Sequence, residues 1–146
     1  TYGPRMRIKD ARQTFLGVWI KNLLQGKPIQ VFGDGKQRRD YNYIEDVLDA
    51  LILTATKENT IGKSFNLGAS DPLNLEDTAK IMCKLVEGAS YEIVPFPEDR
   101  KAIDVGDFIC DFDAFSKSFG WQPKVSFQEG IFRSLEFFKP ELKNYI

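Results

Sequence analysis

The sequence of 146 residues is long enough for one compact domain with a buried core, and its 42% hydrophobic and 28% charged residues are typical of an ordinary soluble protein. Twenty Lys and Arg residues against 21 Asp and Glu residues give a net charge of −1, which argues against a protein that binds duplex DNA. The absence of histidine excludes Ser-His-Asp and Cys-His catalysis and removes the commonest zinc ligand.

The two cysteines, Cys83 and Cys110, are far apart and form no Cys-x-x-Cys pair, so neither a disulfide framework nor a metal site is expected. We interpret them as reduced, largely buried thiols of a cytoplasmic protein. The longest apolar run, residues 15–20, is far shorter than a membrane span, and no secretory leader is visible. The chain starts at Thr1 without an initiator Met, which suggests a fragment boundary or processing.

The first half of the chain contains three segments with the apolar spacing of regular elements: a helix over 11–25, a strand over 29–32 and a helix from 44 to about 57. Asp10 is the expected N-cap of the first helix, and Gly26 followed by Pro28 ends it. Gly33 and Gly35 break the chain in a turn after the strand.

The second half continues the alternation of short helices and strands. The expected elements are a strand over 63–67, a helix over 75–86, a strand over 91–95, a short helix from 111 or 113 to 120, and a last helix after 126. Asn74 and Ser126 are the expected N-caps, and Pro140 is expected to interrupt the last helix. This pattern predicts a small α/β domain of α+β-like character rather than a doubly wound sheet.

The segment 31–46 has the composition of an anion site. Its two glycines allow close approach of a ligand to the backbone, and Arg38 and Arg39 supply planar, permanently charged groups suited to a diphosphate. The glycine spacing and the missing Lys-Ser/Thr pair exclude a Walker A loop. Composition alone favours a simpler interpretation, a β-turn whose surface arginines pair with the carboxylates that follow.

A second basic pair, Arg100 and Lys101, lies in the charged stretch 99–107, where isolated charges usually face water. Arg5 near the N-terminus has the same ordinary interpretation. No spacing of carboxylates or hydroxyls identifies a nucleophile or a general base, so we predict no catalytic residue. The residues alone therefore indicate an α/β domain with one candidate anion site.

Four segments, in the same order along the chain, resemble the extended short-chain dehydrogenases/reductases that act on nucleotide sugars: Tyr2-Gly3-Pro4-Arg5, residues 31–47, Phe65-Asn66-Leu67-Gly68 and Gly120-Trp121-Gln122-Pro123. The resemblance spans nearly the whole chain. It implies that residues 1–146 are the C-terminal part, which closes over a nucleoside-diphosphate sugar, and that the Rossmann cofactor domain is missing. The family's Gly-x-x-Gly-x-x-Gly fingerprint and catalytic Tyr-x-x-x-Lys pair do not occur in this sequence.

The resemblance assigns a role to each of six positions: Arg39 to the diphosphate, Val31 and Phe32 to the nucleotide base, Arg5 to the sugar and nicotinamide end, and Arg100 or Lys101 to a second phosphate contact. Arg100 departs from the family's pattern, because the residues directly before Gly106-Asp107 are Asp104 and Val105. Four other residues are expected to hold the domain together: Asp40, Tyr43, Asp46 and Asn66.

The family resemblance implies a homodimeric parent enzyme that transfers a hydride from the sugar to NAD and back, as a UDP-glucose 4-epimerase-like or dTDP-glucose 4,6-dehydratase-like protein. The run from Ile103 to Asp107 favours the 4-epimerase side. The fragment alone is then inactive and binds no NAD. Two alternatives stay open, a stand-alone sugar-nucleotide-binding module and a protein-interaction domain. A fragment of this kind should expose apolar residues, for which we expect the region of Phe15 and Trp19.

Overall fold

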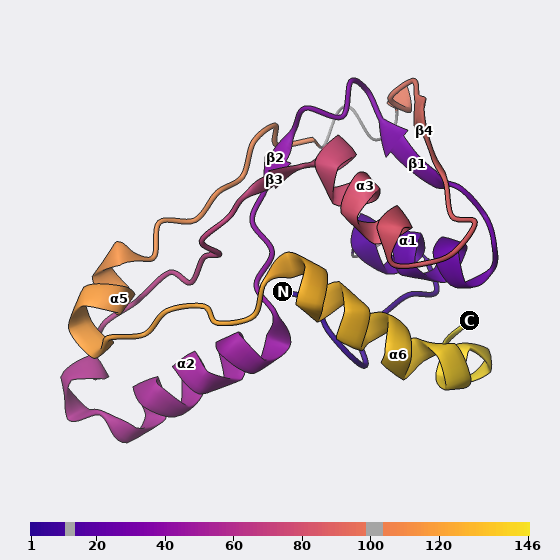
Figure 1. Ribbon diagram of the computed structural model, residues 1–146. Helices are drawn as coiled ribbons and strands as arrows, with labels where there is room; N and C mark the ends of the chain where they lie inside the picture. Colours follow the sequence, from indigo (N-terminus) through magenta and orange to yellow (C-terminus); the bar gives the residue numbers. More distant parts are fainter. Residues whose placement is uncertain (11–13, 99–103) are drawn as a thin grey trace.

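The computed structural model describes residues 1–10, 14–98 and 104–146. Its regular elements are α1 (Phe15–Leu24), β1 (Ile29–Phe32), β2 (Arg38–Arg39), α2 (Ile44–Thr56), the 3₁₀ helix η1 (Glu58–Thr60), β3 (Leu73–Asn74), α3 (Leu75–Lys84), β4 (Tyr91–Val94), α5 (Asp113–Phe119) and α6 (Phe127–Tyr145). Figure 1 shows α1, α3, β1 and β4 toward one end of the molecule and α2 with α5 at the other end. Extended segments that include β2 and β3 connect the two ends.

Two short strand pairs form the sheet structure. β1 and β4 are parallel, with Ile29 opposite Tyr91 and Phe32 opposite Val94, and β2 is antiparallel to β3, with Arg39 opposite Leu73. The expected strand over 63–67 does not form, since these residues carry no ladder partner in the described chain. A strand exists only when a neighbouring segment completes its hydrogen bonds, and local sequence cannot show whether that neighbour is present.

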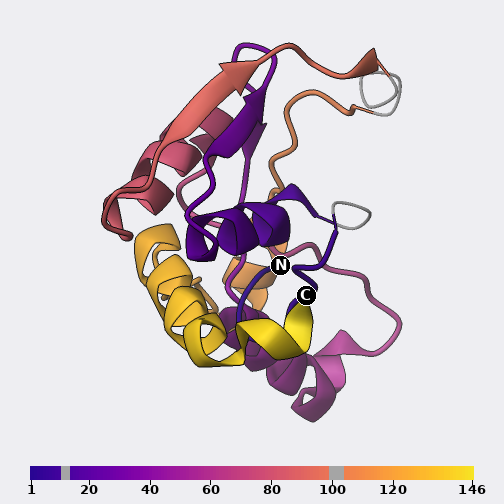
Figure 2. The ribbon, with the colours of Figure 1, turned by 90° about the vertical axis from the view of Figure 1, so that its right-hand side faces the viewer.

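The main hydrophobic core lies between α1, α3, α6 and the strand β1. Figure 2 shows α1 between the β1–β4 pair and α6, which places its apolar stripe against both. Large side chains from all of these elements are completely buried: Ile20, Ile29, Met82, Ile131 and Phe138. Burial of a side chain of this size stabilises the fold by about 1.5–3 kcal/mol relative to exposure, so this core is the main source of stability.

Side-chain caps fix the starts of α3 and α6. Asn74 Oδ1 accepts the Asp77 N–H at 2.7 Å, and Ser126 Oγ accepts the Glu129 N–H at 3.3 Å. Each bond satisfies a backbone donor that the first helical turn leaves without a partner. Both predicted N-caps are confirmed.

The start of α1 differs from the prediction. Thr14 is the N-cap, and its Oγ1 accepts the Leu16 N–H at 3.3 Å, while Asp10 forms an ion pair with Arg7 at 2.7 Å. The prediction that Asp10 caps the helix is wrong because Thr14, also a good capping residue, lies directly before the first described turn. Residues 11–13 lie outside the described residues.

The end of α6 also differs from the prediction, because the helix continues through Pro140 to Tyr145. A proline inside a helix removes one N–H donor and crowds the preceding turn, which bends a helix as often as it ends one. Figure 2 shows the C-terminal turns of α6 leaving the direction of its first turns. Phe138 is completely buried in the main core, and Leu142 and Tyr145 beyond the proline pack against that core, so tertiary contacts hold the last turns in place.

A second, smaller apolar cluster joins α2 and α5. Ala50, Phe115 and Trp121 are buried in it, and Phe65 and Leu67 pack against them. The residues expected to form a strand thus contribute side chains to this cluster while their backbone stays irregular. Their apolar pattern is explained by burial alone.

The outer face of α2 is apolar and exposed. The helix predicted from residue 44 to about 57 is confirmed, but Leu48, Leu51 and Ile52 are 49%, 55% and 62% exposed. The expectation that the region of Phe15 and Trp19 supplies the exposed apolar surface is wrong, because Trp19 is only 4% exposed. Since α1 packs against α6 and β1, its apolar side chains are covered, whereas α2 carries three exposed large apolar residues.

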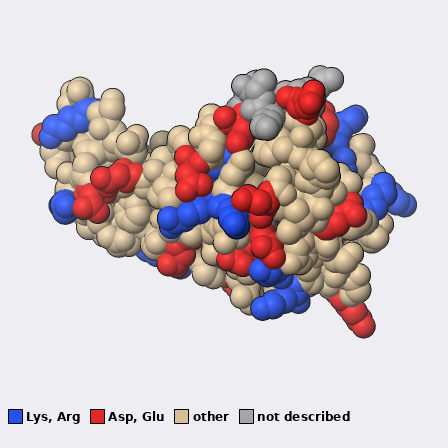
Figure 3. All heavy atoms as spheres, turned by 90° about the horizontal axis from the view of Figure 1, so that it is seen from above, with Lys and Arg blue, Asp and Glu red and all other residues tan. Residues whose placement is uncertain are grey.

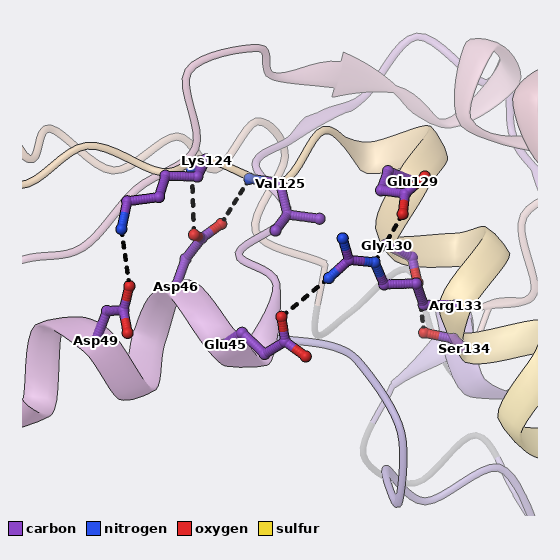
Figure 4. A network of polar contacts seen from close by, with 9 residues as sticks. All are labelled: Glu45, Asp46, Asp49, Lys124, Val125, Glu129, Gly130, Arg133 and Ser134. Atoms are coloured by element: carbon purple, nitrogen blue, oxygen red, sulfur yellow. Dashed lines mark hydrogen bonds and ion pairs between the residues drawn. The ribbon is translucent and has the colours of Figure 1, made fainter.

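A polar network connects α2, the segment before α6, and α6 itself (Figure 4). Asp46 is buried, and its two carboxylate oxygens accept the N–H groups of Lys124 at 3.0 Å and Val125 at 3.1 Å. On the exposed side, Arg133 bridges Glu45 at 2.9 Å and Glu129 at 2.7 Å. The buried part of the network fixes the two ends of the molecule relative to each other.

The surface charges of the described residues are mixed. Figure 3 shows Lys and Arg interspersed with Asp and Glu over the face seen from above, without a continuous basic area. Within the described chain, no helix has the length and apolar character needed to cross a membrane, and no group of three or more metal-ligating residues comes together. Cys83 and Cys110 are free and half-buried, and burial raises the pKa of both thiols.

Candidate functional site

Three backbone segments lie side by side and fix the position of Arg39: β2, β3 and the segment around Phe108. β2, which carries it, pairs with β3 on one side and forms a parallel bridge from Arg39 to Phe108 on the other. The Phe108 N–H donates to the Arg38 carbonyl at 3.0 Å, and the Arg38 N–H donates to Asp107 Oδ1 at 2.8 Å. These bonds bring the segment 104–108 next to the arginine pair, although more than 60 residues separate the two in sequence.

The guanidinium of Arg39 lies in a pocket of acceptors. Its side chain is 18% exposed, and it donates to the carbonyl groups of Arg38 and Gly106, to Gln37 Oε1 at 3.4 Å and to Asp104 Oδ1 at 3.4 Å. Gln37 Nε2 in turn donates to the other oxygen of Asp104. The candidate anion-binding residue is therefore held by a carboxylate of the same chain.

Asp104 and Gln37 belong to this site, although neither is among the residues predicted from the sequence. Asp104 stands two residues before Gly106, in a charged stretch that predicts a solvated loop. Gln37 lies two residues before Arg39, and residues at this spacing on an extended strand point to the same face. That spacing was the one local signal that Gln37 belongs with Arg39.

Arg38 differs from Arg39 in its surroundings. Its side chain is exposed, whereas that of Arg39 is half-buried, as expected for neighbours on a strand that point to opposite faces. The two arginine side chains therefore do not form one combined anion-binding group. Of the pair, Arg39 is the one placed in a recess.

Val31 and Phe32 lie at the C-terminal end of β1. Val31 is completely buried, so its side chain belongs to the core and only its backbone can face a ligand. Phe32 is half-buried and packs against Phe96, with ring centroids 5.7 Å apart. Gly33 follows with a φ of 73°, a conformation that favours glycine, and turns the chain away from the strand. The aromatic rings of Phe32 and Phe96 thus lie together at the C-terminal end of β1.

Arg5 lies on the N-terminal segment. Tyr2 forms a bridge to Tyr43, and the Ile44 N–H donates to the Tyr2 carbonyl at 2.9 Å, so this segment is fixed next to the start of α2. Arg5 itself is exposed and has a φ of 67°, a left-handed conformation that is uncommon outside glycine. Arg100 and Lys101, the other two predicted site residues, lie outside the described residues.

The residues expected to support the domain are mostly confirmed. Asp40 Oδ2 accepts the Cys110 N–H at 3.1 Å, Tyr43 is 1% exposed, and Asp46 holds the segment before α6. Asn66 does not fit the expectation, because it is exposed on the irregular segment that replaces the expected strand.

The tyrosines near Arg39 are structural. Tyr41 is held by a hydrogen bond of 3.1 Å with Thr78 Oγ1, and burial raises its pKa from 10.0 to about 12. Burial also raises the pKa of Tyr2 strongly, with the neighbouring Tyr43 and Asp46 adding to it. A tyrosine that acts as a general base needs a lowered pKa, so neither phenol is prepared for proton transfer near neutral pH.

Comparisons with known proteins agree on one family. The family model described as the NAD dependent epimerase/dehydratase family matches residues 1–68. The dTDP-glucose 4,6-dehydratase of Haemophilus influenzae is 30% identical over 94% of this chain and 46% of its own length. The UDP-glucuronic acid decarboxylase 1 of Arabidopsis thaliana is 29% identical over 99% of this chain and 32% of its own length. The chain thus spans less than half the length of these curated relatives.

The fold agrees with the same group. The crystal structure of UDP-glucose 4-epimerase from Thermotoga maritima with UDP-glucose superimposes with a TM-score of 0.76 and 28% identity, over 97% of this chain and 44% of that protein. Fold and sequence together define a small, partial α/β domain that matches part of these nucleotide-sugar enzymes. Over the matched residues, the chain is similar in sequence and fold to the NAD-dependent epimerase/dehydratase family, a group of extended short-chain dehydrogenases/reductases.

Proposed function

We propose that residues 1–146 are the nucleotide-sugar-binding region of an NAD-dependent epimerase or dehydratase, and that Arg39 binds the diphosphate. The observation that carries this proposal is the position of Arg39 in a recess between β2 and the segment 104–108. A guanidinium in such a place can form two parallel, charge-assisted hydrogen bonds with phosphate oxygens. Partial burial makes those bonds stronger than the same contacts on an open surface.

The remaining roles in the proposed site follow the resemblance. Phe32, at the end of β1 with Phe96 beside it, supports a role in contacting the nucleotide base, to which Val31 contributes through its backbone. Arg5 is assigned to the sugar end of the ligand. Arg100 or Lys101 supplies the second cation for the diphosphate, an assignment that rests on the resemblance alone.

For the whole protein we propose a homodimeric enzyme that uses NAD, most similar in activity to UDP-glucose 4-epimerase. The solved 4-epimerase with UDP-glucose supports this choice, and the dTDP-glucose dehydratase relative is the alternative. The cofactor takes a hydride from the sugar and returns it. No residue of this chain is assigned to the hydride transfer. The chain alone is therefore expected to bind the substrate and to be catalytically inactive.

Calorimetric titration of the chain with UDP-glucose and dTDP-glucose, with NAD as a control ligand, tests this proposal. We expect a sugar nucleotide to bind and NAD not to bind. Arg39→Ala should weaken binding about tenfold to a hundredfold, the equivalent of one or two charge-assisted hydrogen bonds. The matched control is Arg38→Ala, which removes the same charge from the opposite face of β2 and should change affinity less than about twofold.

Binding that is equally strong in Arg39→Ala would contradict the proposed role of Arg39. A larger loss of affinity in Arg38→Ala than in Arg39→Ala would indicate that the exposed Arg38 binds the diphosphate instead. The nucleotide that binds more tightly would identify the preferred base.

A further inference from the structure

Arg39 has an anionic partner within its own chain, Asp104. A guanidinium carries five N–H donors, and the two terminal nitrogens of Arg39 donate to two backbone carbonyls, to Gln37 and to Asp104. A phosphate group would need the same donors. The side chains that hold Arg39 therefore occupy the place in which a diphosphate would bind it.

The contact with Asp104 is more than a surface ion pair. The two side chains are 18% and 20% exposed, so water screens their attraction less than in an open pair. Gln37 contacts both partners, because its amide nitrogen donates to Asp104 and its amide oxygen accepts from Arg39. This arrangement orients the carboxylate toward the guanidinium, and about a fifth of each side chain stays exposed to solvent.

We propose that Asp104 is an internal competitor of the ligand's diphosphate, which must displace it from Arg39 in order to bind. This inference rests on the proposed function of Arg39. A carboxylate and a phosphate repel each other, so both cannot share one guanidinium at full strength. Asp104 thereby lowers the affinity for any diphosphate and favours ligands whose other contacts offset its displacement.

The backbone allows this exchange. Asp107 and Phe108 attach the same segment to Arg38 through two hydrogen bonds of 2.8 and 3.0 Å. These bonds do not involve the Asp104 side chain, so the carboxylate can rotate away while the segment stays beside β2. Displacement of Asp104 then requires a change of rotamer rather than an unfolding of the site.

Asp104→Asn tests the inference, because it removes the charge and keeps the shape and one acceptor oxygen. We expect it to bind UDP-glucose and inorganic pyrophosphate about fivefold to tenfold more tightly than the natural chain, since it deletes a charge-assisted competitor. The matched control is Asp113→Asn, the same charge change at an exposed carboxylate of α5 that contacts Lys117. It should alter the affinity less than about twofold.

The gain must depend on Arg39. In the Arg39→Ala background, Asp104→Asn should produce no increase in affinity, which a double-mutant cycle measures. Circular dichroism verifies that each variant folds, and Asp104→Ser replaces the asparagine variant if that one does not.

Two outcomes overturn the inference, and they are distinguishable. If the natural chain binds UDP-glucose through Arg39 and Asp104→Asn binds no more tightly, Asp104 is not a competitor and the proposed function stands. If neither the natural chain nor Asp104→Asn binds UDP-glucose or pyrophosphate at millimolar concentration, a released Arg39 does not hold phosphate. The proposed role of Arg39 then fails as well.

Discussion

Single residues connect parts of this chain that are far apart in sequence, and Asp46 does so most directly. Its carboxylate accepts the N–H groups of Lys124 and Val125, and its carbonyl accepts the Trp121 indole N–H at 3.2 Å. Asp46 is 3% exposed, and its bonds to Lys124 and Val125 are partly buried. A group in this position stabilises the fold chiefly because its removal would leave partly buried donors unsatisfied.

Asp46→Ala is therefore expected to lower the free energy of unfolding by about 3 kcal/mol, the cost of leaving two partly buried N–H donors without acceptors. Asp49→Ala, one helical turn later, is the matched control. Asp49 forms only an exposed ion pair with Lys124 Nζ, so its removal should cost less than about 1 kcal/mol. Urea denaturation of the two variants measures the difference, and similar losses for both would contradict this account of Asp46.

At the same scale, the sequence predicted Arg39 but not the pocket around it. The arginine was identifiable because glycines precede it and the segment resembles a family pattern. Its partner Asp104 is 65 residues away, and the pairing of the segment 104–108 with β2 brings the two together. An ion pair across such a distance in sequence is a tertiary contact, and no local pattern encodes it.

At the scale of elements, local signals predicted the helices well and one strand badly. α2, α3 and α6 follow from apolar spacing and, for the last two, from capping residues. The segment 63–67 has the composition of a strand but lacks a partner in the described chain. Pro140 predicts an interruption of the last helix, but α6 continues past it, because contacts of Phe138 and Tyr145 outweigh the local cost of a proline.

The apolar outer face of α2 leads to a prediction about self-association. Since Leu51 and Ile52 are more than half exposed, Leu51→Lys and Ile52→Lys should change the free energy of unfolding by less than about 0.5 kcal/mol. We expect the natural chain to associate with itself as its concentration rises, and the double variant to associate less, because exposed apolar surface drives association. Sedimentation velocity measures this, and a natural chain that stays monomeric at high concentration would refute it.

At the scale of the whole molecule, the buried phenols make stability depend on pH in the alkaline range. Burial raises the pKa of Tyr41 from 10.0 to about 12 and that of Tyr2 further, so the folded chain holds these protons more tightly than the unfolded chain. Their contribution to stability is complete below pH 10 and is lost as the pH rises through about 12.

Ultraviolet titration of tyrosine ionisation in buffer and in urea checks this prediction. Part of the phenolate absorbance should appear at higher pH in buffer than in urea, and its appearance should coincide with the loss of structure seen by circular dichroism. Identical titration curves in the two solvents would show that the tyrosines are not buried as described.

The proposed function of the molecule depends on the place where it meets a nucleotide sugar. Two locations compete on structural grounds: the recess of Arg39 beside the segment 104–108, and the hollow near α5 that is lined by Ile52, Phe119 and Trp121. The first offers a half-buried guanidinium with acceptors around it. The second is lined mainly by apolar side chains, and its Lys124 is exposed and paired with Asp49. A diphosphate requires the first.

Titration of the isotope-labelled chain with UDP-glucose, followed by NMR, tests this central claim most directly. We predict that the largest chemical-shift changes fall on residues 37–40 and 104–108, on Phe32 and on the Arg39 side chain, and that they disappear in Arg39→Ala. Shift changes centred on Trp121, or changes that persist in Arg39→Ala, would contradict the assignment of Arg39 as the diphosphate ligand.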